Sequence, residues 1–150
     1  MTQTVRLAIY DMDRTITVRG TYTPFLLHAA RRLAPWRLAL APLTLFAFAA
    51  YGLKLIGRAR LKEINQALLL GRATRPALAK VTDSFAAHTL ESNIRQGALD
   101  QIAADRAGDW RVVLATASYR LYVEDIARRL GIGADDVIAT NSLAGLDQRI

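Results

Sequence analysis

The chain has 150 residues, a formal net charge of +7 and no cysteine, and 52% of its residues are apolar. This is enough for the core of one domain, or of one domain with an insertion. The lack of cysteine excludes disulfides and thiolate metal sites, and together with the absence of a signal-peptide pattern it favours a cytoplasmic protein. No zinc-finger spacing, RNP-like aromatic motif or P-loop is present, so we expect no nucleic-acid partner.

The first predicted element is a strand that ends in two carboxylates. Residues 5–10 form a mainly apolar, partly β-branched run, and Asp11, Asp13 and the hydroxyl of Thr15 follow it. In open parallel sheets, ligands bind just beyond the carboxyl ends of the strands. Two acids at such an end could hold Mg²⁺ and a phosphate, with Asp11 as a nucleophile and Asp13 as a general acid and base. The alternative is a turn in which both acids are only solvated.

A strongly basic segment follows the two acids. Between residues 16 and 80 the chain has 11 Lys and Arg but one acid, Glu63, so this segment carries +10 and the remainder carries −3. A field of this sign attracts anionic partners such as a phosphorylated substrate or an acidic lipid. The alternative is a helical surface that is merely solvated by its Arg residues. Apolar spacing predicts helices in and beyond this segment, over residues 24–33, 63–70, 77–90 and 94–107.

The most unusual stretch is Leu38–Leu53, sixteen residues without a charge and with basic residues on both sides. It is shorter than the ~20 apolar residues that a membrane-spanning helix needs, and Pro42 lies near its start. Three interpretations remain open: a buried core helix of the insert, a helix at a membrane surface or against a membrane partner, and a spanning helix. Trp36 and Tyr51 near its ends are typical of the headgroup region, so peripheral membrane contact through residues 36–62 is one of them.

A second strand is expected where another apolar run meets polar residues. Residues 112–115 end in Thr116-Ala117-Ser118, and a helix is predicted from about residue 119 to 130. Hydroxyl and N–H groups at a strand-to-helix turn can hold a phosphate oxygen, although Thr116 and Ser118 could also simply cap the helix. A short third strand is predicted over residues 136–140. The order strand, helical insert, strand, helix, strand indicates an α/β fold with a parallel sheet.

The two polar turns resemble the motifs of a known family. Asp-Met-Asp-Arg-Thr at residues 11–15, directly after a strand, is similar to the first motif of the haloacid dehalogenase (HAD) superfamily. The run at residues 111–118, with Thr116 in the motif position, resembles the second motif. The helical insertion resembles the cap of subfamily IB, which contains phosphoserine phosphatase. The resemblance implies a Rossmann-like α/β core at residues 1–17 and 108–150, with a helical cap inserted at residues 18–107.

The resemblance also implies an activity, that of a Mg²⁺-dependent phosphomonoester hydrolase with an aspartyl-phosphate intermediate. Asp11 and Asp13 would be catalytic and would hold the metal. The substrate would be a phosphorylated small molecule or a lipid phosphate. Phosphoserine phosphatases have a cap Glu soon after the first motif, but no acid lies between Asp13 and Glu63, which disfavours phosphoserine. The residues expected to bind phosphate or substrate are Thr15, Thr116, Ala117 and Ser118.

Two motifs of HAD phosphatases are missing after the second one. Those enzymes carry a Lys and then an acidic motif, whereas no Lys lies between Ser118 and Ile150, and Asp135, Asp136 and Asp147 come too early. We therefore expect a fragment of a longer enzyme, with an exposed sheet edge through which it could oligomerise. The alternative is an inactive HAD-like scaffold that binds a protein partner or the inner face of a membrane through its basic, apolar insert.

Overall fold

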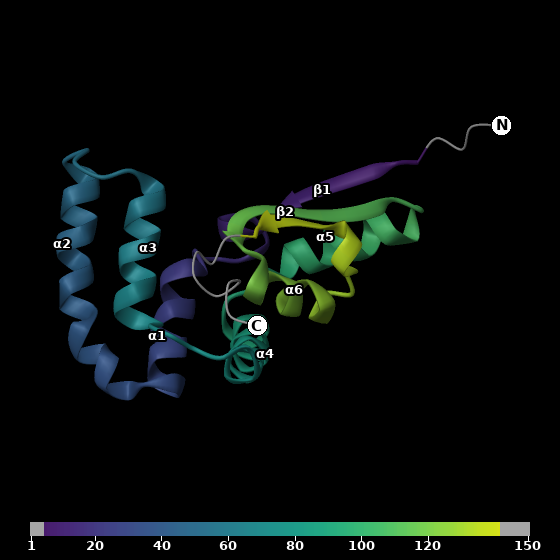
Figure 1. Cartoon of the computed structure of the whole chain (residues 1–150). Coiled ribbons are helices and arrows are strands. Elements are labelled where there is room, and N and C mark those ends of the chain that lie inside the picture. The colour runs from purple at the N-terminus through teal and green to yellow at the C-terminus, as the bar shows by residue number, and fades with distance from the viewer. Residues whose placement is uncertain (1–4, 142–150) are drawn as a thin grey trace. The chain divides into compact units, whose positions relative to one another are not determined.

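The computed structural model describes residues 5–141, which include a parallel sheet of three strands (Figure 1). The strands lie in the order β1 (Leu7–Asp11), β2 (Arg111–Tyr119) and β3 (Val137–Thr140). The register places Asp11 opposite Ala115, and Ala115 opposite Ile138. The predicted α/β fold with a parallel sheet is therefore confirmed.

Helices and short helical turns connect the strands. They are η1 (Met12–Ile16), α1 (Tyr22–Leu33), η2 (Pro35–Leu40), α2 (Ala41–Gly52), α3 (Arg58–Leu69), α4 (Arg75–Ser92), α5 (Gln96–Ala107), α6 (Arg120–Arg129) and η3 (Ala134–Asp136). The predicted helices correspond to α1, α3, α4, α5 and α6. Of these, α3 begins earlier than predicted, at Arg58, because Gly57 immediately before it has extended backbone angles that end the preceding loop.

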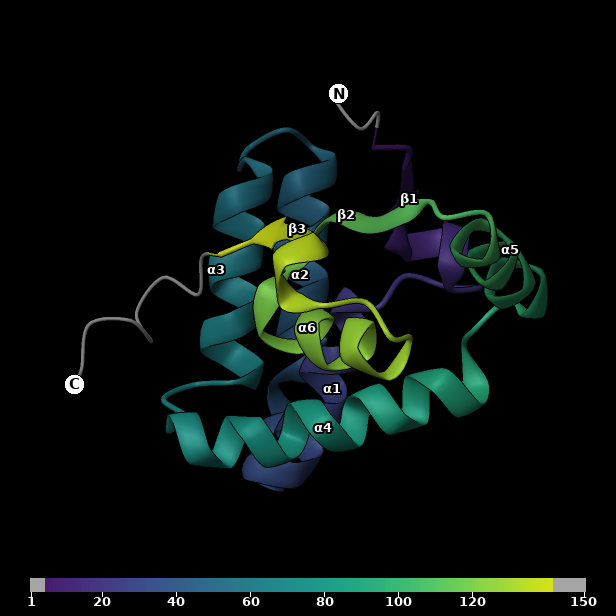
Figure 2. The same ribbon diagram turned by 90° about the vertical axis from the view of Figure 1, so that its right-hand side faces the viewer.

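One face of the sheet carries the core of this part of the chain. Helices α5 and α6 lie on the same side of the sheet (Figure 1 and Figure 2). On that face Leu114 and Val137, which are opposite each other in the register, are 0% and 2% exposed. On the other face Ile9 and Ile138 are both 61% exposed. Val113 of the central strand lies on this second face, opposite Ile9 in the register, and is 7% exposed, so the exposed side chains of this face belong to the two flanking strands.

Helix α6 is amphipathic and seals the covered face. Tyr122, Val123, Ile126 and Ala127 are all fully buried, at the three- and four-residue spacing of one helical face. The ring of Tyr122 packs edge-on against Phe85 of α4, with 5.5 Å between the ring centroids. This contact gives α6 a large apolar anchor next to the end of β2.

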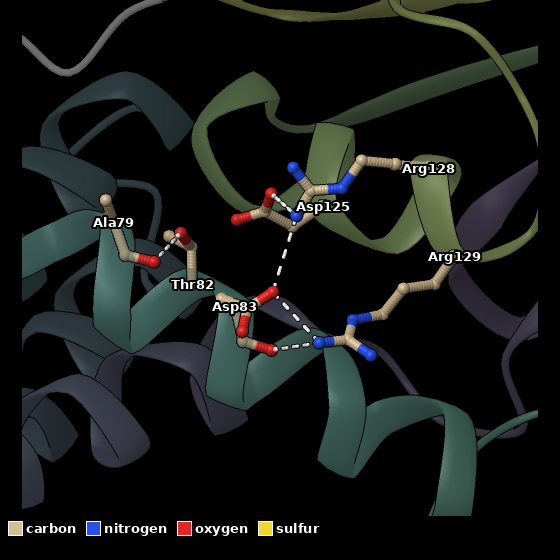
Figure 3. A network of polar contacts seen from close by, with 6 residues as sticks. All are labelled: Ala79, Thr82, Asp83, Asp125, Arg128 and Arg129. Carbon is tan, nitrogen blue, oxygen red and sulfur yellow. Dashed lines mark hydrogen bonds and ion pairs between the residues drawn. The ribbon is translucent and has the colours of Figure 1, made fainter.

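Surface ion pairs also join α4 to α6 (Figure 3). The carboxylate of Asp83 accepts hydrogen bonds from Arg128 at 3.3 Å and from Arg129 at 2.9 Å, and Arg128 also binds Asp125 at 2.7 Å. The side chains of Arg128 and Asp83 are more than half exposed, so each pair contributes no more than ~1 kcal/mol. The stability of this contact therefore comes mainly from the apolar packing around Tyr122.

The described chain divides into two compact units. Helices α1 and α4 each contribute residues to both units. One unit comprises residues 5–22 and 83–141 and contains the sheet with α5 and α6. The other comprises residues 23–82 and contains α2 and α3. The division into a core and a cap at residues 18 and 107 stays a prediction.

Within the second unit, α2 and α3 pack against each other as a helical hairpin (Figure 1). Helix α3 buries Leu61 and Leu69, whereas the buried residue of α2 is Ala47. Leu45 and Phe46 of α2 are 67% and 73% exposed. The interpretation of residues 38–53 as a buried core helix is therefore wrong for α2. No helix among the described residues has the length and apolar character needed to cross a membrane.

The C-terminal end of α3 is closed by Arg37. Its guanidinium donates to the carbonyl oxygens of Ala67 and Leu68, each at 2.9 Å. Gly71 follows with a φ of +60°, and a Cβ at this position would lie 2.3 Å from the guanidinium. The backbone angle favours glycine, and a Cβ at this position would also require the Arg37 guanidinium to move. Gly71 therefore follows the end of the helix, in agreement with the predicted helix over residues 63–70, and Arg37 has a structural role.

Candidate functional site

The candidate site is formed by the loop that follows β1. Met12 and Ile16 are fully buried and anchor this loop to the core. Between them Arg14 has a φ of +67°, in the left-handed region, which costs a residue other than glycine on the order of 1 kcal/mol. The buried hydroxyl of Thr17 offsets this cost, because it accepts the N–H of Arg14 at 3.2 Å and shares its own proton between the carbonyls of Arg19 at 2.8 Å and Met12 at 3.0 Å. The loop is thus held in one conformation.

Asp13 is fixed by three hydrogen bonds from two distant segments. Its Oδ1 accepts the backbone N–H of Thr21 at 2.7 Å and the hydroxyl of Thr21 at 2.8 Å. Its Oδ2 accepts the hydroxyl of Ser118 at 2.6 Å. Thr21 directly precedes α1 and Ser118 lies near the end of β2. Three donors on one half-buried carboxylate restrict both its position and its rotation, as a group with a defined role requires.

Asp11 is the last residue of β1, and its side chain is exposed. Its Oδ1 accepts the N–H of Met12 at 2.8 Å, which orients the carboxylate at the start of the loop. The register places Asp11 opposite Ala115, directly before Thr116. The register therefore places Thr116 one residue beyond the partner of Asp11, next to the end of β1.

The segment that was predicted as a turn, residues 116–118, is part of β2. Pairing continues after a shift in register, so that Tyr119 lies opposite Thr140 of β3. The hydroxyl of Thr140 also donates to the carbonyl of residue 117 at 2.9 Å. The predicted end of the strand at Ala115 is wrong, because these contacts with β3 hold the next four residues extended.

Of the predicted phosphate-binding residues, the structure brings Ser118 into direct contact with Asp13. The N–H of Ser118 donates to the hydroxyl oxygen of Thr116 at 3.1 Å, so Thr116 is linked to Asp13 through Ser118. Ala117 and Thr15 are exposed, at the end of β2 and in the loop after β1. All these residues belong to the unit that contains the sheet.

Two residues of this arrangement were not identified from the sequence, Thr21 and Tyr122. The hydroxyl groups of the two side chains lie 3.1 Å apart. Burial raises the pKa of Tyr122, against the opposing effect of its hydrogen bonds with Ser118 and Thr21, so it stays a neutral phenol. A hydroxyl residue immediately before a helix is typical of an N-cap and could have singled out Thr21. No local pattern connects either residue with Asp13.

The acids considered for a later motif lie elsewhere. Asp136 binds Arg111 with 2.6 Å between Oδ1 and Nε, and Asp135 is in η3. Asp147 is outside the described residues. Across residues 5–141, no group of three or more His, Cys, Asp or Glu side chains is arranged to hold a metal ion.

A family model for haloacid dehalogenase-like hydrolases matches residues 8–149 of this chain. The match covers both polar strand ends and the helical segment between them. Among curated proteins, none is significantly similar to the chain in sequence.

Three solved structures resemble this one in fold. A protein of unknown function from Bordetella pertussis Tohama I has 21% identity and a TM-score of 0.74, over 92% of this chain and 61% of that one. A phosphoserine phosphohydrolase-like protein from Francisella tularensis subsp. tularensis SCHU S4 has 11% identity and a TM-score of 0.58, over 90% and 58%. The DsGPDH of Dunaliella salina has 22% identity and a TM-score of 0.65, over 97% and 22%. The chain spans 61% or less of each of these proteins.

Proposed function

Because the chain belongs to the haloacid dehalogenase-like hydrolase family, we propose that it carries the phosphoryl-transfer residues of a phosphomonoester hydrolase. Asp11 is the nucleophile in this proposal, and Asp13 is the general acid and base. The observation that supports it most is the anchoring of Asp13 by Thr21 and Ser118, beside the end of β1. A pair of acids that is only solvated in a turn would not need donors from two distant segments.

The reaction has two steps. In the first, a carboxylate oxygen of Asp11 attacks phosphorus, the bond from phosphorus to the leaving oxygen breaks, and that oxygen takes a proton from Asp13. In the second, Asp13 takes a proton from water while the water oxygen attacks phosphorus, and the bond from phosphorus to the Asp11 oxygen breaks. Phosphate leaves, the carboxylate of Asp11 is free again, and Asp13 is again protonated.

The hydrogen bonds determine where Asp13 would hold this proton. A backbone N–H can only donate, so Oδ1, which accepts the N–H of Thr21 at 2.7 Å, is the oxygen that stays unprotonated. The proton is then on Oδ2, next to Ser118, whose hydroxyl can act as either donor or acceptor. Ser118 can therefore follow both protonation states of Asp13 without losing its contact.

HAD superfamily members generally use Mg²⁺, and the residues at the end of β1 fit part of such a site. The exposed carboxylate of Asp11 is a hard oxygen donor with one protein hydrogen bond on Oδ1. Asp13 would have to exchange a hydrogen bond to bind the ion, since both its oxygens are engaged. Asp11 and Asp13 are the ligands in this proposal, with water and phosphate oxygens as the others. When bound, Mg²⁺ would neutralise charge on the transferred phosphoryl group.

Thr15, Thr116, Ala117 and Ser118 are the proposed contacts for phosphate. Thr116 accepts the N–H of Ser118 with its oxygen, which leaves its own O–H as a donor for a phosphate oxygen. A phosphorylated small molecule or a lipid phosphate is the proposed substrate class. The neighbour named phosphoserine phosphohydrolase-like supports a phosphatase in general. Phosphoserine itself is disfavoured, because no acid lies between Asp13 and Glu63 to bind its amine.

The test is phosphate release from p-nitrophenyl phosphate with Mg²⁺. Asp11→Asn should reduce turnover to background, and Asp13→Asn should lower it roughly 10²–10⁴-fold. The matched control is Asp109→Asn, because Asp109 is exposed and its φ of +59° is one that asparagine tolerates well. Turnover that is unchanged in Asp11→Asn would show that the proposed nucleophile is wrong.

The second candidate is a HAD-like scaffold without catalysis, which binds a membrane surface or a protein partner through residues 36–62. The exposed apolar side chains of α2 favour it. A cytoplasmic location at the inner face of the membrane would fit both candidates. They are separated by the same assay: Mg²⁺-dependent turnover that requires Asp11 belongs only to the enzyme.

A further inference from the structure

Helix α2 buries a small apolar side chain and exposes its large ones, which is the opposite of what is usual for a helix of a globular domain. Its buried residue is Ala47, at 6% exposed, while the larger side chains face outward. Amphipathic helices normally bury the large apolar residues and expose the small or polar ones. The exposed ones are Leu43 (46%), Leu45 (67%), Phe46 (73%), Phe48 (39%) and Tyr51 (40%).

The exposed apolar surface continues around the tip of the hairpin. Leu53 and Leu55, in the loop between α2 and α3, are 71% and 73% exposed. Lys54 between them is exposed as well and has a φ of +59°, so the chain turns sharply at this position. Before α2, in η2, Trp36 is 64% exposed. Large apolar side chains exposed in this number on one helical hairpin mark an interaction site more often than a solvated surface.

The charges next to this surface are positive. Arg58 and Arg60 are exposed at the start of α3, and Arg60 also pairs with Glu63 at 3.0 Å. Glu63 is the one acid between residues 16 and 80, against 11 Lys and Arg. Arg37, by contrast, is held by the carbonyls at the end of α3 and serves the fold. We call the exposed residues 36, 43, 45, 46, 48, 51, 53–55 and 58 the apolar–basic surface.

We propose that the apolar–basic surface binds an anionic phospholipid bilayer, with α2 lying in the boundary between headgroups and acyl chains. Exposed aromatic and aliphatic side chains would enter the boundary, while Lys54 and Arg58 contact the lipid phosphates. This inference goes beyond the proposed hydrolase activity and does not depend on it. It names an anionic lipid surface as the partner, whatever the substrate is.

The length of α2 distinguishes a helix that lies on a bilayer from one that crosses it. The twelve residues of α2 make a helix about 18 Å long, against a hydrocarbon thickness of about 30 Å. The helix that follows carries Arg58, Arg60 and Lys62 in its first turns, and such charges are costly in hydrocarbon. Helix α2 is therefore too short to cross the bilayer and lies in the boundary of one leaflet, with the start of α3 at the headgroups.

The charge also separates a lipid partner from a second copy of this chain. Two copies that met through the apolar–basic surface would bring together two segments that each carry +10. Like charges across an interface are unfavourable, whereas an anionic bilayer complements them. Complementarity of charge and apolar area together favours the lipid surface.

Co-sedimentation with vesicles tests the proposal. The chain should bind vesicles of phosphatidylcholine and phosphatidylserine (3:1), bind less as salt is raised, and stay in the supernatant with phosphatidylcholine alone. Phe46→Ser should lower the partition coefficient by roughly tenfold or more, since a buried Phe contributes that much. The matched control is Ile138→Ser, an apolar side chain with 61% exposure in the other unit, which should bind like the wild type.

A second set of variants tests the charge contribution and does not depend on apolar residues. Lys54→Gln and Arg58→Gln should each weaken binding about fivefold, because one basic residue near an anionic surface contributes about that factor. Arg95→Gln, an exposed position in the other unit, is the control. In Trp110→Phe, Trp36 is the remaining tryptophan, and its emission should shift to the blue with anionic vesicles.

Equal recovery in the supernatant with and without anionic vesicles would overturn the proposal. So would a dimer that Phe46→Ser converts to a monomer while vesicle binding is absent, because the surface would then be an interface between copies. Binding that is the same in Phe46→Ser and wild type would also overturn it. Asp11→Asn should bind vesicles like the wild type, so failure of the hydrolase proposal and failure of this one are distinguishable.

Discussion

The unit that contains the sheet and the α2–α3 hairpin use apolar residues in opposite ways. Leu114, Tyr122 and Ile126 of the sheet unit are fully buried. In the hairpin, Phe46 is 73% exposed while Asn65 is 1% exposed, and the side-chain oxygen of Asn65 has no hydrogen-bond partner among the described residues. Apolar content alone therefore does not indicate where a protein's core is.

The contrast separates positions that stabilise the fold from positions that are available for contact. A buried large side chain adds to stability, while an exposed one adds almost nothing until a partner covers it. In the sheet unit, the buried side chains position the loop that carries Asp11 and Asp13. In the hairpin, the same kinds of side chain remain available to a partner.

The largest expected effect comes from two matched truncations. Leu114→Ala, at a fully buried position, should lower the free energy of unfolding by about 2–5 kcal/mol. Leu45→Ala, at a position 67% exposed, should change it by no more than about 0.5 kcal/mol. Urea unfolding followed by circular dichroism measures both. Similar losses in the two variants would mean that α2 is buried in solution, and the comparison would fail.

A second test compares the two exposed apolar surfaces as sites of self-association. In the described chain, β1 pairs with β2 alone, and Ile9 is 61% exposed on the face of the sheet opposite α5 and α6. Ile9→Lys should weaken self-association through this strand in sedimentation velocity, because a lysine on an edge strand opposes strand pairing. Phe46→Ser should leave self-association unchanged. The reverse pattern would assign the contact between copies to α2.

The smallest expected effect concerns the phenol next to the candidate site. Burial raises the pKa of Tyr122 above its ordinary value of 10.0, so its neutral form stabilises the fold fully below pH 10, and this contribution is lost as the pH rises further. Between pH 8 and pH 11, the free energy of unfolding of Tyr122→Phe should therefore fall by about 1 kcal/mol less than that of the wild type. Tyr10, whose pKa is raised to about 12, titrates in both proteins and provides the background. If the free energy of unfolding falls equally with pH in the two proteins, Tyr122 is in contact with solvent.

Much of the local structure could be predicted from the sequence. The strand before Asp11, the stop at Gly71 and the helices beyond it follow from periodicity and turn residues, which act over a few positions. The end of β2 could not be predicted in this way. Its extension to Tyr119 depends on pairing with β3, about twenty residues further along the chain, and such a contact leaves no local pattern.

The candidate site shows the same division. A strand followed by two acids and a hydroxyl is a local signal, and it identified Asp11 and Asp13. That Thr21 and Ser118 bind the same carboxylate is a contact across 97 positions of the chain, and only folding brings these residues together. Which face of α2 is buried also depends on a contact with another element. The sequence alone determines that the helix is apolar, but which of its faces is buried depends on α3, whose packing accepts Ala47 and leaves Leu45 and Phe46 outside.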